Sequence, residues 1–169
     1  DGDHPWHRLE RGEVSFADAS TAIAELARAS GHHGVDPMEV LMALATDRGV
    51  RDFMVDLVRD LRTRGIATGI ITNNLAEFGE AWRAMIPVDE LFDDIVDSCE
   101  VGMRKPDPAI YRLACERLGV TPEASLFIDD HQGNVAGARS VGMGAVWCGL
   151  TVESTRAASQ ELLALIGPG

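Results

Sequence analysis

The feature that most constrains this chain is a short apolar run that ends in two adjacent aspartates. Residues 126–128, Leu-Phe-Ile, are followed directly by Asp129 and Asp130, then by a polar turn and small residues up to Met143. Such a run is typical of a strand buried on both faces of a parallel sheet. Ligands of open α/β sheets bind outside the carboxyl ends of the strands, so we expect the two acids to lie at a binding site.

The chain from about residue 50 alternates strand and helix signals. This alternation predicts an α/β fold, a Rossmann-like parallel sheet covered by helices on both faces. One of the helices should bury Phe78, Trp82 and Met85 and end at Pro87. The predicted strands are 66–71, 95–98, 126–128 and 144–148, and the other predicted helices are 50–65, 107–119, 131–142 and 154–166.

The first 48 residues carry no strand signal. A helix should start after Ser15, with Asp18 in its first turn, and stop at Ser30-Gly31; its apolar side would carry Phe16, Ala19, Ile23 and Leu26. A second helix should follow the Asp36-Pro37 start signal and end near Gly49. We therefore expect a helical segment over residues 1–48 and an α/β core over residues 49–169.

The composition limits which binding partners and which cellular compartment we expect for the protein. The 169 residues include 27 acidic and 15 basic side chains, a net charge of −12, which argues against nucleic acid and anionic membranes as partners. No apolar run reaches the roughly 18 residues of a membrane span. Three cysteines at irregular spacing support neither a disulfide framework nor a metal site, so we expect a soluble protein of the reducing cytoplasm.

Polar side chains follow three of the predicted strands or their loops. They are Thr72-Asn73-Asn74, the loop that holds Lys105, and Asp129-Asp130. A threonine hydroxyl beside the N–H groups of a helix start can bind a phosphate, and a lysine can pair with a phosphate oxygen. Adjacent carboxylates offer hard oxygen ligands to a cation. Because parallel strands share one carboxyl edge, these groups together indicate a phosphoryl-transfer centre.

Each signal also has a simpler structural explanation. The Thr72-Asn73 turn could only cap a helix, the KPDP sequence after residue 104 is a common helix start, and Asp129-Asp130 could be a cap followed by a surface charge. Phospho-receiver domains combine the same residue types, but with the acids first; here Thr72 and Lys105 precede the acids.

The three segments resemble a known family. ITNN, VGMRKPDPAIY and LFIDDHQGNVAGARSVGM are similar, in this order, to the second, third and fourth motifs of the haloacid dehalogenase-like hydrolases. The likeness is greatest to the group that includes the phosphatase domain of soluble epoxide hydrolase. It covers roughly residues 50–150, and HPWHRLERGEVSFADA looks like the helical cap of this group.

The resemblance implies a role for each site residue. Thr72 would bind the transferring phosphoryl group through its hydroxyl, with the Asn73 amide assisting. Lys105 would orient the nucleophile and neutralise charge on the phosphoryl group, so Thr72 and Lys105 are the expected catalytic residues. Asp130 would bind Mg²⁺ directly, and Asp129 would bind it through water or support the site from behind. The implied substrate is a small phosphorylated metabolite.

One element of the family pattern is not found in the sequence. The first motif, an Asp-x-Asp pair after a strand, supplies the nucleophile; Asp1-Gly2-Asp3 has the spacing, but no apolar strand precedes it. In the family's sheet the missing strand would be central, beside the strands that end at Thr72 and Asp129. A sheet without it would leave buried backbone groups unpaired, at roughly 1–3 kcal/mol each. We therefore expect the nucleophile upstream of Asp1.

The sequence thus predicts a Mg²⁺-dependent phosphomonoester hydrolase that acts through an aspartyl-phosphate intermediate, with residues 1–169 alone inactive. Two alternatives remain open. A haloacid dehalogenase needs no metal, so it has little use for Asp129-Asp130, and a non-catalytic relative would keep the fold for binding. The helices of residues 1–48, which would select the substrate, show no diagnostic pocket residue.

Overall fold

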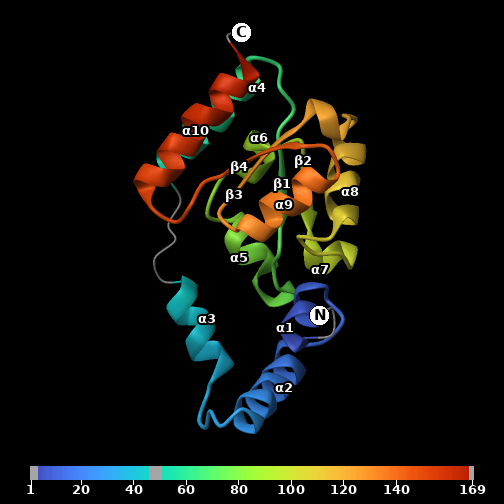
Figure 1. The fold of residues 1–169 in the computed structure, drawn as a ribbon, viewed down its shortest axis with the longest axis vertical. Coiled ribbons are helices and arrows are strands. Elements are labelled where there is room, and N and C mark those ends of the chain that lie inside the picture. The colour runs from blue at the N-terminus through green and yellow to red at the C-terminus, as the bar shows by residue number, and fades with distance from the viewer. Residues whose placement is uncertain (1–3, 46–50, 168–169) are drawn as a thin grey trace.

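The computed structural model describes residues 4–45 and 51–167, and its strands form two separate parallel pairs (Figure 1). The register aligns Thr72 with Asp97 in one pair and Asp129 with Trp147 in the other. The predicted parallel α/β architecture is therefore confirmed. The first pair is β1 (Gly69–Thr72) with β2 (Asp94–Asp97), and the second is β3 (Leu126–Asp129) with β4 (Gly144–Trp147).

Helices cover the strands on two sides. Helices α8 (Pro108–Leu118) and α9 (Gln132–Ser140) contact each other and pack on the strands, whereas α4 (Asp52–Thr63) and α10 (Val152–Ile166) lie together on the opposite side (Figure 1). The shorter elements are η1 (Ala76–Phe78), α5 (Gly79–Arg83), α6 (Val88–Leu91), α7 (Ser98–Val101) and η2 (Pro122–Ala124).

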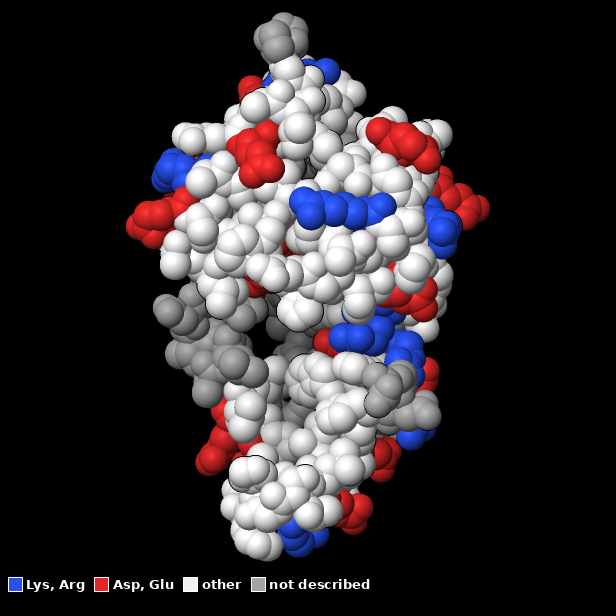
Figure 2. Space-filling model, viewed as in Figure 1, with Lys and Arg blue, Asp and Glu red and all other residues white. Residues whose placement is uncertain are grey.

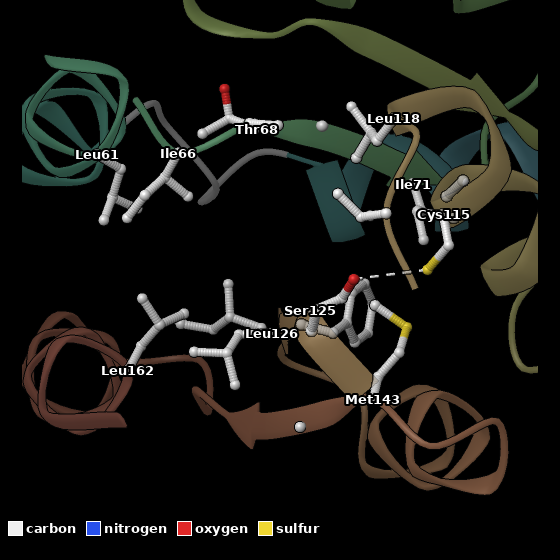
Figure 3. A pocket seen from close by; sticks show the side chains of 18 of the residues that line it. Leu61, Ile66, Thr68, Ile71, Cys115, Leu118, Ser125, Leu126, Met143 and Leu162 are labelled. Atoms are coloured by element: carbon white, nitrogen blue, oxygen red, sulfur yellow. Dashed lines mark hydrogen bonds between the residues drawn. The ribbon is translucent and has the colours of Figure 1, made fainter. Parts of the chain in front are cut away.

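A cavity of about 570 Å³ separates the two strand pairs. Ile71 of β1 lines it on one side and Leu126 of β3 on the other, with Leu61 of α4 and Leu162 of α10 beside them (Figure 3). Within the described residues, no backbone pairing joins β1 to β3. The sheet is thus interrupted where the sequence comparison with the family's strand order predicts a missing central strand.

The main hydrophobic core lies between the strands and helices α8 and α9. Ile110 and Tyr111 of α8 are completely buried, and the Tyr111 ring meets the Phe127 ring edge to face, with centroids 5.4 Å apart. The Tyr111 hydroxyl donates a hydrogen bond of 2.8 Å to the Asn134 carbonyl in α9. Strand β3 is therefore held against both helices by one aromatic side chain. Other members of this core are Val96, Ala114, Cys115, Val135, Ala138, Met143 and Ala145.

The N-terminal helices form a second, smaller core with the segment after β1. They are α1 (Pro5–Glu10), α2 (Phe16–Ala29) and α3 (Pro37–Ala45). Leu9 and Ala19 pack with Leu75, so this core joins the helices to the strand-bearing part of the molecule. The Ser15 hydroxyl caps α2 by accepting from the Asp18 N–H at 3.2 Å, as predicted. Gly49, where the helix after Asp36 was expected to end, lies outside the described residues.

The first strand begins later than its β-branched sequence suggests. The predicted strand starts at Ile66, whereas β1 starts at Gly69. Thr68 lies before the strand and makes other contacts. Its hydroxyl donates to the Leu91 carbonyl at 2.6 Å, and its N–H donates to the Asp93 carboxylate at 2.9 Å. These contacts join the approach to β1 to the approach to β2.

The prediction of one helix ending at Pro87 is wrong. The chain there breaks into η1 and α5, and Met85 is 58% exposed instead of buried. Pro87 comes just before α6, where Val88 and Leu91 supply the buried contacts. Leu26, predicted on the apolar side of its helix, is also exposed, at 48%. An apolar residue at helical spacing is not necessarily covered when its helix lies at the periphery.

Acidic and basic side chains are interspersed over the face seen in Figure 2, which is hollowed between the N-terminal helices and the strand-bearing part. Among the described residues, no helix combines the length and apolar character of a membrane span.

Replacing Tyr111 tests the core. Tyr111→Phe keeps the ring but removes the hydrogen bond to α9, and should lower the free energy of unfolding by about 1 kcal/mol. Tyr111→Ala should lower it by about 3–5 kcal/mol because a large cavity forms. Urea unfolding followed by circular dichroism measures both. The exposed neighbour Arg112 provides a control, since Arg112→Ala should change stability by less than about 0.5 kcal/mol.

Candidate active site

A buried ion pair lies at the carboxyl edge of the strands. The Lys105 ammonium is 2.7 Å from Oδ2 of Asp129, and the two residues are only 9% and 8% exposed. Lys105 comes from the loop before α8 and Asp129 ends β3. The ammonium also lies 5.6 Å from the centre of the Phe127 ring. The structure thus brings together two of the residues that the sequence singles out.

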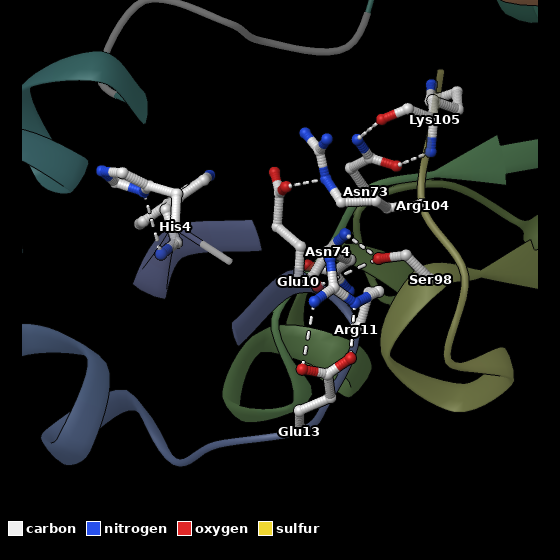
Figure 4. A network of polar contacts seen from close by, with 10 residues as sticks. His4, Glu10, Arg11, Glu13, Asn73, Asn74, Ser98, Arg104 and Lys105 are labelled. Carbon is white, nitrogen blue, oxygen red and sulfur yellow. Dashed lines mark hydrogen bonds and ion pairs between the residues drawn. The ribbon is translucent and has the colours of Figure 1, made fainter. Parts of the chain in front are cut away.

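Asn73 fixes the lysine loop. Its side-chain amide donates to the Lys105 carbonyl at 2.9 Å, and its side-chain oxygen accepts from the Lys105 N–H at 2.8 Å (Figure 4). Two reciprocal bonds hold the backbone of Lys105 beside the end of β1. Asn73 therefore has a structural role in the site, in addition to the assistance in phosphate binding that the resemblance implies.

Both carboxylate oxygens of Asp129 have partners. Oδ2 meets Lys105, and Oδ1 accepts from the His131 N–H at 2.8 Å and from the Asn134 side-chain amide at 2.9 Å. This full set of partners offsets the cost of burying the charge. The Asp129 carboxylate is thereby fixed at the end of β3.

Asp130 directly follows β3 and is partly buried. Its backbone carbonyl accepts a 2.9 Å hydrogen bond from the indole of Trp147, which positions the loop after β3. In the part of the chain that the structure describes, no three His, Cys, Asp or Glu side chains are grouped as a ready metal site. Mg²⁺ commonly binds one or two protein carboxylates together with waters and phosphate oxygens, and the donor chemistry of this edge fits that pattern.

Thr72 ends β1 and lies level with Asp97 of β2. The segment after Thr72 continues through the three-residue η1 directly into α5, and the Asn74 N–H donates to the Ser98 hydroxyl at 3.0 Å. The Asn74 side chain also donates to the buried Asp97 at 3.0 Å. These contacts order the turn after Thr72, and the cradle of helix N–H groups expected behind it stays a prediction.

A glycine allows α9 to approach the lysine loop. A β-carbon at Gly137 would lie 2.6 Å from the Pro106 carbonyl and 3.0 Å from the Tyr111 ring, closer than atoms can pack. Any larger residue would move α9 away from the segment that carries Lys105. Asn134 lies on the same helix and contacts Asp129 across the turn that joins β3 to α9.

The thiol nearest the ends of β1 and β2 cannot serve as a nucleophile. Burial, followed by the hydrogen bond to the Asp97 carboxylate, raises the pKa of Cys99 to about 12. The thiol therefore stays protonated at neutral pH. Asp1-Gly2-Asp3, the only Asp-x-Asp spacing near the amino end, lies outside the described residues.

Several contacts in the site carry no local sequence signal. Asp97 ends β2 and Ser98 begins α7, and both are completely buried. From the sequence alone they are only two polar residues at the end of a predicted strand. Glu10 and Arg104 form an ion pair across 94 positions of sequence. Trp147, expected only as part of a strand, holds the loop of Asp130. Apart from Arg104, which lies in the lysine-loop motif, each of these partners lies outside the three motifs and contacts a residue within one of them.

Comparison with known proteins identifies the family. The model of the haloacid dehalogenase-like hydrolases matches residues 3–142, and the chain belongs to this family. It is 34% identical to the sesquiterpene phosphatase astK of Aspergillus oryzae over 96% of this chain and 79% of that protein. It is 26% identical to the bifunctional epoxide hydrolase 2 of Rattus norvegicus over 96% of this chain. The resemblance drawn from the sequence motifs is therefore confirmed.

The structure has the same fold as a solved enzyme of this family from Bacteroides thetaiotaomicron, in complex with magnesium and inorganic phosphate. The TM-score is 0.64 at 20% identity, covering 87% of this chain and 75% of that one. The chain spans 31% of the rat epoxide hydrolase and only 15% of the acyl-CoA dehydrogenase family member 10 of Mus musculus, to which it is 29% identical.

Replacing Asn73 tests how the lysine loop is held. Asn73→Ala leaves the Lys105 N–H and carbonyl without their partners, and should lower the free energy of unfolding by about 1–3 kcal/mol. Urea unfolding gives the value. Gln132→Ala, at an exposed position of α9, is the control and should have little effect. Equal stabilities for wild type and Asn73→Ala would show that solvent replaces both bonds.

Proposed function

We propose that this chain belongs to a Mg²⁺-dependent phosphomonoester hydrolase that acts on a small phosphorylated metabolite. The observation that carries the proposal is the buried Lys105–Asp129 pair at 2.7 Å, held beside the end of β1 where Thr72 lies. A cation, a hydroxyl and carboxylates at one strand edge are the groups that phosphoryl transfer needs. Phosphatases among the relatives support the same chemistry.

In this proposal each side chain has one task. The Thr72 hydroxyl donates to a phosphoryl oxygen, and the Lys105 ammonium lies between Asp129 and the substrate and neutralises charge that grows on the phosphoryl group. Asn73 holds the Lys105 backbone in place while this happens. Asp130 would hold Mg²⁺ directly with Asp129 behind it, and the ion would supply further positive charge to the phosphoryl oxygens. The magnesium and phosphate bound to the enzyme from Bacteroides thetaiotaomicron support this assignment.

The nucleophile would come from a strand that fills the cavity between β1 and β3. Strands that lie two places apart leave room for one parallel strand, whose N–H and C=O groups would pair with both open edges. Its carboxyl end would then lie between Thr72 and Asp129. An aspartate there would attack phosphorus, break the P–O bond to the substrate's alcohol and form an aspartyl-phosphate, and the alcohol would leave after taking up a proton. Water would then attack the aspartyl-phosphate and release inorganic phosphate and the free aspartate. We place this strand in a segment before Asp1.

Residues 1–48 would form the cap that selects the substrate. Helices α1 to α3 lie together at the end of the molecule away from the C-terminus (Figure 1), and α1 contacts α7, which directly follows β2. From this position their side chains would reach the group attached to the phosphate. The core would then comprise residues 49–169.

An activity assay tests whether hydrolysis requires the upstream segment and Mg²⁺. Residues 1–169 should not hydrolyse p-nitrophenyl phosphate, whereas the same chain with its natural upstream segment should do so only with Mg²⁺ present. Chelation with EDTA should abolish the reaction, and adding Mg²⁺ back should restore it. Halide release from a 2-haloacid without metal would instead identify a dehalogenase. Phosphate binding without turnover by the extended chain would identify a non-catalytic relative.

Variants of the extended chain test the two charged groups. Lys105→Ala and Asp130→Asn should each lower kcat by about 10²–10³-fold, because each removes charge that stabilises the transition state. Arg59→Ala is the control, since Arg59 pairs with Glu90 on the exposed surface of α4 and should leave kcat unchanged. Circular dichroism checks that each variant is folded. Full activity in Lys105→Ala would rule out the role given to the lysine.

A further inference from the structure

A partly buried ion pair connects the N-terminal helices to the lysine loop. The Arg104 Nε–H donates to Glu10 Oε2 at 2.6 Å, and the two side chains are 20% and 9% exposed. Glu10 is the last residue of α1, and Arg104 directly precedes Lys105. Figure 4 shows the Arg104 guanidinium between Glu10 and Asn73. One contact therefore joins the first helix to the loop that carries the Lys105 ammonium.

Further contacts between the N-terminal helices and the strand-bearing part hold α1 close enough for this ion pair. Gly12, at φ +68°, follows α1, and a β-carbon there would lie 2.5 Å from the Cys99 carbonyl of α7. The backbone N–H of Phe16 donates to the Glu77 carboxylate at 2.9 Å. Burial, followed by the positive charge of Arg104, lowers the pKa of His7, as expected when the guanidinium faces α1. The position of α1 is thus fixed on several sides, and Glu10 can act as a rigid anchor.

The lysine loop is held from three directions. Asn73 binds the Lys105 backbone, Asp129 binds the Lys105 ammonium, and Glu10 binds the neighbouring Arg104 side chain. The first two partners lie in the strand-bearing part; only Glu10 comes from the N-terminal helices. When Glu10 is removed, the partly exposed Arg104 guanidinium keeps its charge without this partner and can turn toward water or toward another acceptor. Arg104 without Glu10 would therefore pull on the backbone next to Lys105.

We infer that Glu10 and Arg104 are positioning residues that keep the Lys105 loop in its phosphate-binding conformation, so that the docking of the N-terminal helices controls phosphate affinity. Neither residue takes part in the chemical step. The inference rests on the proposed function, because it assigns a second layer of control to the same site. Its signature is a change in the population of binding-competent molecules: apparent affinity falls in proportion to that population, while the rate at saturation is kept.

Steady-state kinetics of the extended chain with p-nitrophenyl phosphate and Mg²⁺ give the first test. Glu10→Gln and Arg104→Gln should each raise KM about tenfold and change kcat by less than about twofold. The double variant should raise KM by no more than the larger single effect, because either change breaks the same pair. The control cycle uses Arg59→Gln and Glu90→Gln, an exposed pair 3.2 Å apart, and should leave KM unchanged.

Other kinetic results would overturn the inference. A fall in kcat at constant KM would mean that the pair only keeps molecules folded. Single effects that add in the double variant would mean that the two residues act separately.

Hydrogen exchange on residues 1–169 tests the coupling without catalysis. The backbone amide of Lys105, which donates to Asn73 in the wild type, should exchange about tenfold faster in Glu10→Gln, and amides of β2 should exchange at the wild-type rate. Unchanged Lys105 exchange would sink the inference even if the enzyme is a phosphatase. Faster exchange, together with an inactive wild-type extended chain, would retain the mechanical coupling and reject the phosphatase function that the inference requires.

Discussion

The buried contact between Lys105 and Asp129 is the interaction on which the rest of the site depends. Two opposite charges this far from water are tolerated only when every other polar atom around them also has a partner. Asp129 meets that condition through His131 and Asn134, and the Lys105 backbone meets it through Asn73. Four loops and helices must therefore be in place together, and the pair acts as a common reference point for them.

This requirement explains why the helices around the site pack so closely. Gly137 lets α9 come within contact of the lysine loop, and Tyr111 joins α8 to α9 through its hydroxyl. These approaches set the lysine loop against α9, whose Asn134 holds the same carboxylate that Lys105 binds. The apolar core and the polar site thus share the same helix contacts. A substitution that disturbs the packing of the core should therefore also change the geometry of the site.

Prediction from the sequence succeeds where the determining signal is local. The caps at Ser15 and Asp107, the parallel strands and the acids after β3 all follow from a few adjacent residues. It fails where the outcome depends on distant partners: Thr68 leaves its strand to bind Leu91 and Asp93, and Met85 stays exposed because no element covers it. The ion pair between Glu10 and Arg104 joins residues 94 positions apart, and no periodicity or spacing marks it.

The cavity between β1 and β3 also reflects the absence of a distant partner, because the strand edges that face it lack a pairing strand among the described residues. In each parallel pair the two strands bond to each other along one edge, whereas in the described part of the chain no strand pairs with β1 or β3 on the side that faces the cavity. The apolar lining, with Ile71 on one side and Leu126 on the other, suits a buried strand better than water. Such a strand would complete the hydrogen bonding of both pairs and end beside Lys105 and Asp129. Folding of the core and assembly of the catalytic site would then be completed by the same event.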